Sequence, residues 1–196
     1  MKITDNICFY KGREEEKLVR GAGSCNVVVL KSDRQVMVDT GLIVGGAFRD
    51  LSRAASADGI DLSKTSAVLH THSHWDHITG DMIVQKKYGA KVYAHSWGKP
   101  NIESKDEAFK TFVLDDGDFY GEVIGSPPFA IRLVLRYAGG TYSGLRVDEV
   151  LHGGEEMDFG WKVLAFHAPG HTPGHMVYYF PEEKVLAGGD LIDLET

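Results

Sequence analysis

One short run of residues constrains the fold of this chain more than any other part of it. Residues 68–80 begin as an apolar segment and continue with four histidines and an aspartate. In an extended segment alternate side chains share a face, so His72 and His74 can hold one metal ion. Asp76 and His77 fall where the chain should turn into a helix. They can face a second ion, because two-metal sites hold their ions roughly 3.5 to 4 Å apart. The run therefore predicts a strand that ends in a metal site.

Two later turns favour the same interpretation. Residues 169–175, Pro-Gly-His-Thr-Pro-Gly-His, place His171 at the apex of a proline-bounded turn, and residues 187–190 end an apolar strand on Asp190. Glycine permits close backbone approach and proline fixes a turn, so both ligands would be held in place before a metal arrives. A polar surface loop that happens to be rich in histidine would explain the first run alone, but not the two later turns.

Together these motifs resemble the metallo-β-lactamase superfamily, whose signature His-x-His-x-Asp-His is read here at residues 72–77. The resemblance extends to Val-Asp-Thr-Gly at residues 38–41, to the turn at 170–174 and to Gly-Asp at 189–190. These motifs follow the family's order and run from about Cys25 to the last residue. The resemblance implies an α/β fold, a four-layer αββα sandwich with helices outside two sheets.

By this resemblance six residues would bind metal: His72, His74, Asp76, His77, His171 and Asp190. The first two histidines of the signature would join His171 in one site. Asp76 and His77 would contribute to the second site, and Asp190 would bridge both ions. Asp39 would orient the histidine loop without touching metal.

This ligand set contains histidine and carboxylate but no cysteine. It suits one or two Zn²⁺ ions per chain best, with Fe or Mn as alternatives, because imidazole binds several first-row ions. A water whose pKa the metal lowers to near 7 would be the nucleophile, and Asp76 would have the catalytic task of orienting it. The resemblance thus implies a metal-dependent hydrolase of a small ester-like bond, such as a thioester or a lactone.

Two other functions stay open. One is an iron-dependent oxidoreductase of the persulfide dioxygenase kind, which uses the same scaffold with one metal. The other is a non-catalytic module that holds one structural ion or none. The family usually supplies a further histidine beyond Gly-Asp, whereas this sequence ends six residues after Asp190. We therefore expect a shortened form in which the second site lacks a ligand and the last elements of the sandwich are missing. The alternative is a second site that another histidine or another chain completes. Exposed apolar sheet surface would then favour a homo-oligomer.

The other five histidines receive no metal role. His70 should pack against the strand that precedes the signature, and His175 should support the site. His95 sits at a predicted strand end, and His152 and His167 are assigned nothing.

Alternation and turn residues predict a series of strands, at residues 3–10, 25–30, 35–39, 67–70, 91–95, 161–166, 176–180 and 184–187. Helices are predicted between Gly45 and Gly59 and over residues 78–88. A single domain should cover residues 1–196, with an insertion of uncertain structure at about 96–146 that includes a strand candidate at 131–137. The insertion would carry substrate specificity or contact a partner subunit.

The bulk composition fits a globular domain with a small-molecule substrate. Net charge is −7, from 21 basic and 28 acidic residues, which disfavours a nucleic-acid partner. The apolar runs are strand-sized, so no membrane span is expected. The first residues lack the pattern of a secretory signal, which predicts a cytoplasmic protein and disfavours a β-lactamase. Cys8 and Cys25 should be buried free thiols.

Overall fold

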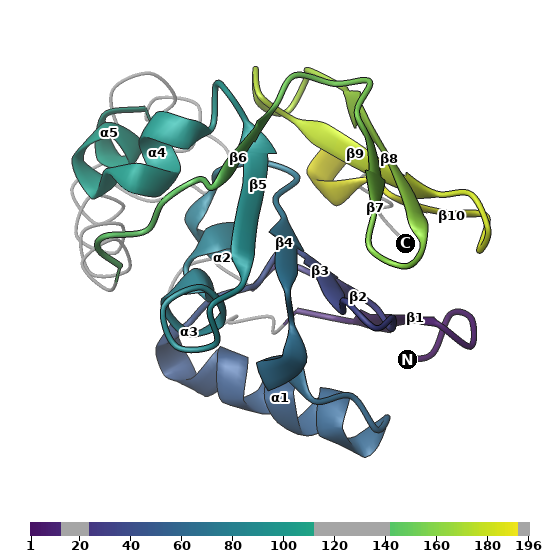
Figure 1. The fold of residues 1–196 in the computed structure, drawn as a ribbon. Coiled ribbons are helices and arrows are strands. Elements are labelled where there is room, and N and C mark those ends of the chain that lie inside the picture. Colours follow the sequence, from purple (N-terminus) through teal and green to yellow (C-terminus); the bar gives the residue numbers. More distant parts are fainter. Residues whose placement is uncertain (13–23, 112–141, 192–196) are drawn as a thin grey trace.

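The computed structural model describes residues 1–12, 24–111 and 142–191. Its first sheet has six strands in the order β1-β2-β3-β4-β5-β6 (Figure 1). The bounds of these strands are β1 Ile7–Tyr10, β2 Val27–Leu30, β3 Val36–Val38, β4 Ala67–Leu69, β5 Lys91–His95 and β6 Glu149–Leu151. The strands from β1 to β3 pair antiparallel, and those from β3 to β6 pair parallel.

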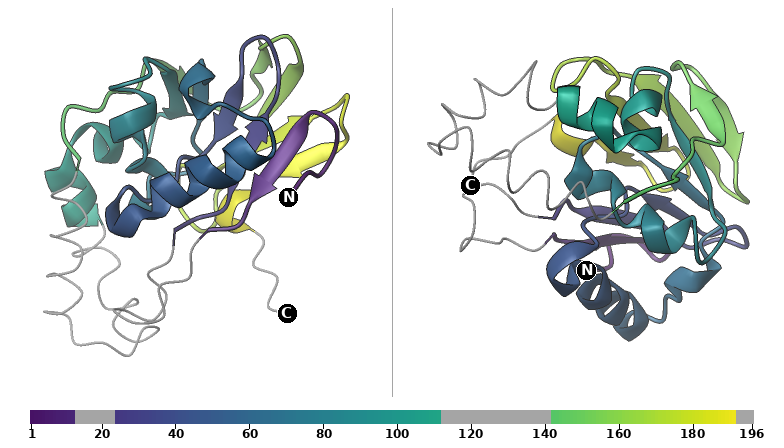
Figure 2. Two further views of the ribbon diagram at one scale, coloured as in Figure 1. Left: turned by 90° about the horizontal axis from the view of Figure 1, so that it is seen from below. Right: turned by 90° about the vertical axis from the view of Figure 1, so that its left-hand side faces the viewer.

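The second sheet has four antiparallel strands in the order β10-β9-β8-β7. Their bounds are β7 Glu156–Asp158, β8 Lys162–His167, β9 Met176–Phe180 and β10 Val185–Ala187. This sheet lies on the side of the first sheet away from helix α1, Ala47–Ala57 (Figure 2). A hydrophobic cluster with members from both sheets, among them Leu69 and Tyr178, fills the space between them.

The central strands of the first sheet are apolar throughout because both of their faces are buried. Val36 and Val38 of β3 belong to the cluster between the sheets, whereas Met37 belongs to the cluster under the helices. Leu69 and Val68 of β4 divide between the two clusters in the same way. Such strands read as continuous Val/Ile/Leu runs, which is why the sequence predicts them well.

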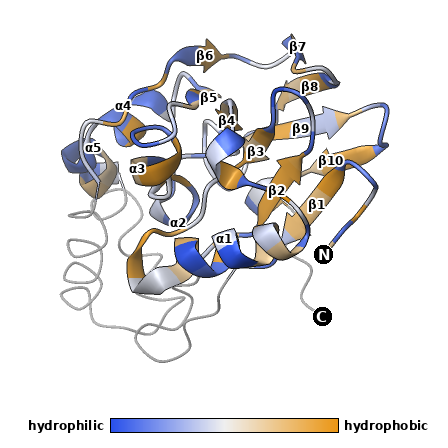
Figure 3. Ribbon diagram, turned by 60° about the horizontal axis from the view of Figure 1, so that its bottom comes forward, coloured by the Kyte–Doolittle hydropathy of each residue, from blue (hydrophilic) through white to orange (hydrophobic). Residues whose placement is uncertain are grey.

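Helices cover the other face of the first sheet. Besides α1, the described helices are α2 Trp75–Ile78, α3 Asp81–Val84, α4 Lys99–Glu103 and α5 Lys105–Lys110, with 3₁₀ turns at Val44–Gly46, Leu62–Lys64 and Gly189–Leu191. Phe48 and Ala55 of α1 are buried against the sheet, and the polar side of α1 faces outward (Figure 3). The order helices, sheet, sheet confirms the predicted α/β class and provides three layers of the αββα sandwich. The outer face of the second sheet leaves Phe166 and Leu186 exposed.

The predicted helix over residues 78–88 is wrong as a single element. Within this range Ile78 is the last residue of α2, and α3 covers Asp81–Val84 only. Between them Gly80 donates its backbone N–H to the Gly41 carbonyl (2.9 Å) instead of to the preceding helical turn. A Cβ at Gly80 would lie 2.3 Å from the carbonyl oxygen of Thr40. The chain bends here because it packs directly on the loop that follows β3.

The predicted insertion at 96–146 joins the core at both of its described ends. Ile102 of α4 and Ala108 of α5 are buried in the cluster under the helices, as are Tyr142 and Leu145. The strand candidate at 131–137 lies outside the described residues. The short strands β6 and β7 were not predicted.

Cys8 and Cys25 are free and buried, as expected. Among the helices of the described ranges, none combines the length and the hydrophobicity that a membrane span requires.

Candidate metal centre

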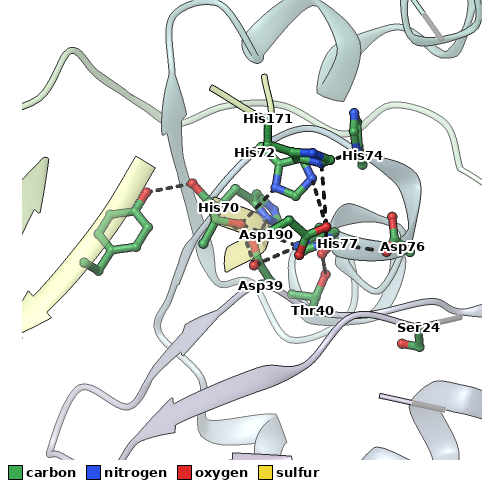
Figure 4. A network of polar contacts seen from close by, with 12 residues as sticks. Ser24, Asp39, Thr40, His70, His72, His74, Asp76, His77, His171 and Asp190 are labelled. Carbon is green, nitrogen blue, oxygen red and sulfur yellow. Dashed lines mark hydrogen bonds and ion pairs between the residues drawn. The ribbon is translucent and has the colours of Figure 1, made fainter. Parts of the chain in front are cut away.

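The carboxyl ends of neighbouring parallel strands meet at one edge of the first sheet. β3 delivers Asp39 to this edge, β4 delivers the loop that begins at His70, and β5 ends at His95. The β8–β9 turn of the second sheet brings His171 to the same edge (Figure 4). Open α/β sheets commonly bind ligands at this kind of edge.

One group of three histidines can hold a metal ion. It consists of His72, His74 and His171, whose ligand nitrogens all lie within 4.8 Å of one another. The ring centroid of His72 is 4.4 Å from that of His74 and 4.8 Å from that of His171. The Nε2 atom of His171 is 3.1 Å from the Nδ1 atom of His74. Two sequence motifs that are far apart along the chain therefore meet here, as predicted.

A second group lies directly beside the first and contains a carboxylate. It consists of His72, His77 and Asp190, again with ligand atoms within 4.8 Å. The Nε2 atom of His77 is 3.4 Å from Asp190 Oδ2 and 3.5 Å from Asp76 Oδ2. Asp190 Oδ2 also lies 3.6 Å from His171 Nε2, so this carboxylate contacts both groups. All six predicted ligands are thus brought together.

The donor atoms of this cluster fit a metal ion. His72 Nε2 and His77 Nε2 are buried and have no hydrogen-bond partner among the described residues. A buried polar atom is seldom left in that state without a ligand. Burial, followed by the neighbouring imidazoles, holds the pKa of His72 and His74 well below its usual value, so both rings stay neutral. Neutral imidazole is the form that binds metal.

Asp39 fixes the orientation of the histidine loop from beneath it. Its carboxylate accepts hydrogen bonds from the Thr71 N–H (2.9 Å), the Thr71 hydroxyl (2.7 Å) and His77 Nδ1 (2.9 Å). Burial opposes ionisation of Asp39, yet the imidazoles of His77 and His70 hold its pKa below the usual value. Nδ1 of His77 donates to this carboxylate, which leaves Nε2 on the side of the second group. Burial opposes the charged form of His77, but its anionic neighbours raise its pKa well above the usual value, so a metal would displace the proton on Nε2.

His70 packs against the strand end as expected, and it also forms a buried ion pair that sequence reasoning missed. Its Nε2 lies 2.8 Å from Asp81 Oδ2, and its Nδ1 lies 3.3 Å from Asp39 Oδ1. Burial lowers the pKa of His70, but the two carboxylates outweigh burial and raise it to about 9. The Thr40 hydroxyl donates to the other oxygen of Asp81 (3.1 Å). No local pattern pointed to Asp81, since its partners lie on other elements.

Cys25 forms a third group with Asp39 and His77, within the same 4.8 Å limit. The oxygens of Asp39 already accept hydrogen bonds from Thr71 and His77. Burial raises the pKa of the Cys25 thiol to about 12. Metals bind the thiolate form, so this group fits a metal less well than the first two.

The four remaining histidines lie in two places. His175 is fully buried and stacks on His72, with centroids 5.1 Å apart. The other three, His95, His152 and His167, gather at the ends of β5, β6 and β8 and belong to neither of the two metal-binding groups.

Comparison with known families agrees with this geometry. The family model of the metallo-beta-lactamase superfamily matches residues 20–192. The chain belongs to this superfamily. Among solved structures, a metallo-beta-lactamase family protein from Thermus thermophilus superposes with a TM-score of 0.69 at 21% identity, over 100% of this chain and 62% of that one. The FEZ-1 metallo-beta-lactamase from Legionella gormanii gives 0.58 at 20% identity, over 79% and 51%. At these identities the likeness shows the fold alone.

Two sequence relatives carry a name that specifies a reaction. Hydroxyacylglutathione hydrolase GloC from Haemophilus influenzae is 25% identical over 86% of this chain and 66% of its own length. Hydroxyacylglutathione hydrolase from Pelagibacter ubique is 28% identical over 65% of this chain and 36% of its own length. The chain therefore spans about one third to two thirds of the curated relatives that it matches.

Proposed function

We propose that this chain is a metal-dependent thioester hydrolase. The observation that carries the proposal is the meeting of two metal-binding groups, in which buried imidazole nitrogens of His72 and His77 lack a hydrogen-bond partner among the described residues. His72, His74 and His171 would hold the first ion. Asp76 and His77 would hold the second, and Asp190, which contacts both groups, would lie between them.

The ions, Zn²⁺ in our proposal, would supply a water of lowered pKa and polarise the substrate carbonyl. The remaining work falls to the residues themselves. Asp76, beside His77 Nε2, would accept a hydrogen bond from the attacking water and orient it. The His171 and Asp190 side chains are 29% and 44% exposed, whereas His72 is fully buried. The substrate would therefore approach from the side of His171 and Asp190.

A thioester is the substrate class that the relatives support. Their name, hydroxyacylglutathione hydrolase, describes removal of an acyl group from the sulfur of glutathione. A thiol has a pKa of about 8.5, so it leaves as a thiolate with little need for a general acid. The site suits this reaction, because the carboxylates at its open side, Asp76 and Asp190, are both placed to bind metal.

Net charge and cysteine content support the proposed substrate class and cellular location. A net charge of −7 favours a small-molecule substrate over nucleic acid. Two free cysteines are typical of a reducing compartment, which supports a cytoplasmic location.

The test compares matched substrates and metals. Purified protein, both as obtained and after loading with Zn²⁺, is assayed against a hydroxyacylglutathione and against the oxygen ester of the same acid. We expect hydrolysis of the thioester, loss of activity after chelation, recovery with Zn²⁺, and loss in Asp76→Asn. Absence of thioester hydrolysis in the zinc-loaded protein, or activity only with iron, would contradict the proposal.

A further inference from the structure

Three histidines outside the two metal-binding groups gather beside the turn that carries His171. The rings of His95 and His167 stack with their centroids 4.2 Å apart and their planes within 14° of parallel. The ring of His152 lies 6.1 Å from that of His95. β5 of the first sheet ends at His95 and β8 of the second sheet ends at His167. The stack therefore links the two sheets directly next to a metal ligand.

His167 is hydrogen-bonded to the turn itself. Its Nε2 atom lies 2.8 Å from the carbonyl oxygen of Pro173. A carbonyl oxygen can only accept, so the proton of His167 is on Nε2 and is donated to Pro173. Within the described ranges, no other side chain donates to the backbone of residues 168–175. The bond spans His171, because His167 precedes that residue and Pro173 follows it.

The ring of His167 packs on the ring of His95. His95 is 5% exposed, and its Nδ1 accepts the backbone N–H of Trp97 (3.2 Å), which leaves the proton on Nε2. Burial lowers the pKa of His95, and the nearby His167 and His152 lower it further, so the ring stays neutral and can stack. The turn packs tightly on the same segment, since a Cβ at Gly174 would lie 2.9 Å from Trp97 Cβ.

We propose that His167, supported by His95, is a positioning residue that holds His171 in place and thereby sets the affinity of the first metal site. The inference rests on the proposed function in taking His171 as a metal ligand. His171 is the only one of the three histidine ligands with a substantially exposed side chain, so its position depends on its turn. Ligands must be held within about 0.5 Å of their working geometry.

The experiment distinguishes the effect of the His167 hydrogen bond from the effect of its ring stacking. His167→Gln places an amide Nε2 where the imidazole Nε2 stands and keeps the donor. His167→Phe keeps a stacking ring and removes the donor. His152→Ala is the matched control, because it removes a histidine of the same cluster that has no described bond to the turn. Metal-free protein is titrated with Co²⁺, and the dissociation constant and visible spectrum of the first bound ion are recorded.

We expect His167→Phe to weaken the first Co²⁺ by roughly 10-fold or more and to alter its spectrum. His167→Gln should retain most of the affinity, and His152→Ala should match the wild type. Thermal unfolding of the metal-free variants reports whether they fold. If His167→Phe does not, His167→Asn replaces it, since its shorter amide cannot reach Pro173.

Wild-type affinity in the variant without a donor, or equal losses in the Phe, Gln and control variants, would overturn the inference. If the wild-type protein bound no Co²⁺ at all, the metal centre itself would be refuted, and the proposed function would fail with the inference. The two failures are therefore distinct.

Discussion

Asp39 shows how much of the site depends on one carboxylate. It accepts from the backbone and hydroxyl of Thr71 and from His77. It also has a positive φ of 60°, which costs a residue with a Cβ roughly 1 to 2 kcal/mol. The hydrogen bonds compensate for that strain and hold the loop above the sheet edge.

Asp39→Asn should therefore weaken metal binding without removing a ligand. One oxygen of Asp39 accepts from the Thr71 hydroxyl and His77 Nδ1, and the other accepts from the Thr71 N–H. An amide has a single acceptor oxygen, so its NH2 group would face at least one of these donors. We expect metal affinity to fall on the order of 10-fold to 100-fold, most at the group that contains His77. Metal content after dialysis against a graded chelator series measures the effect, with the exposed Asp33→Asn as control. Equal metal content in the two variants would refute it.

At this scale the sequence predicts ligands better than their supports. The spacing of His72 and His74 and the rigid turn around His171 are local patterns, and the family resemblance implied the six candidate ligands, which the structure brings together. The residues that orient the candidate ligands have partners far away in the sequence. Asp81 meets Thr40 across 41 positions of the chain, and nothing in either neighbourhood indicates the other.

The secondary-structure elements also differ in how well their own sequence predicts them. β3 and β4 are buried on both faces, which makes them continuous apolar runs that are easy to recognise. β6 and β7 have three residues each and present exposed glutamates, so their sequence carries little strand signal. The break between α2 and α3 was missed because it is imposed by contact with the loop after β3, which local propensity does not register.

Gly80→Ala tests that contact. The φ of Gly80 is −61°, so the new residue meets no backbone strain, but its Cβ would lie 2.3 Å from the carbonyl oxygen of Thr40. We expect a loss of about 1 to 3 kcal/mol in the free energy of unfolding. Urea denaturation measures it. Gly98→Ala is the matched control, with a φ of −81° and a nearest contact of 3.4 Å, and should change stability little. Similar values for the two variants would show that the loop adjusts freely.

Asp148 joins β5 to the segment before β6. Its carboxylate accepts from the Val92 N–H (2.9 Å), Gln85 Nε2 (3.1 Å) and Arg146 Nε (2.6 Å). Burial opposes ionisation of Asp148, but these donors hold its pKa below the usual value. The stabilisation is therefore present above the unfolded pKa, about 3.9, and is lost as pH falls through the lower folded pKa.

Asp148→Asn should lower the free energy of unfolding by about 1 to 2 kcal/mol at pH 7, and the difference should shrink below about pH 4. Denaturation at a series of pH values measures it. Glu149→Gln is the control, because its ion pair with Lys91 (3.7 Å) is exposed and should contribute little. A difference that stayed constant down to about pH 2 would contradict the assignment to the charge.

At the scale of the whole molecule, the predicted sandwich is confirmed in its two sheets and the helices of one side. The outer face of the second sheet exposes Phe166 and Leu186, at 45% and 51%. Self-association through this face stays a prediction, because exposed apolar side chains indicate only that the face can be covered. The extent of the insertion likewise stays a prediction, since residues 112–141 are outside the described ranges.

Metal removal should lower the stability of the whole protein. An ion binds the folded state alone, and at a free concentration of about a thousand times its dissociation constant it adds about 4 kcal/mol of stability. We expect chelated protein to unfold at a lower temperature than zinc-loaded protein, by calorimetry. His171→Ala, which lacks one ligand, should show a much smaller difference between the two states, and an undiminished difference would contradict the role of His171.

His74 follows β4 of the first sheet, whereas His171 lies in the β8–β9 turn of the second sheet. The two residues are 97 positions apart in the chain. An ion held by both would join the two sheets in the folded state, and its loss would raise the population of open states. Proteases cleave open states, so a chain without this ion would be degraded faster. The amount of this protein in a cell would then rise and fall with the supply of the metal.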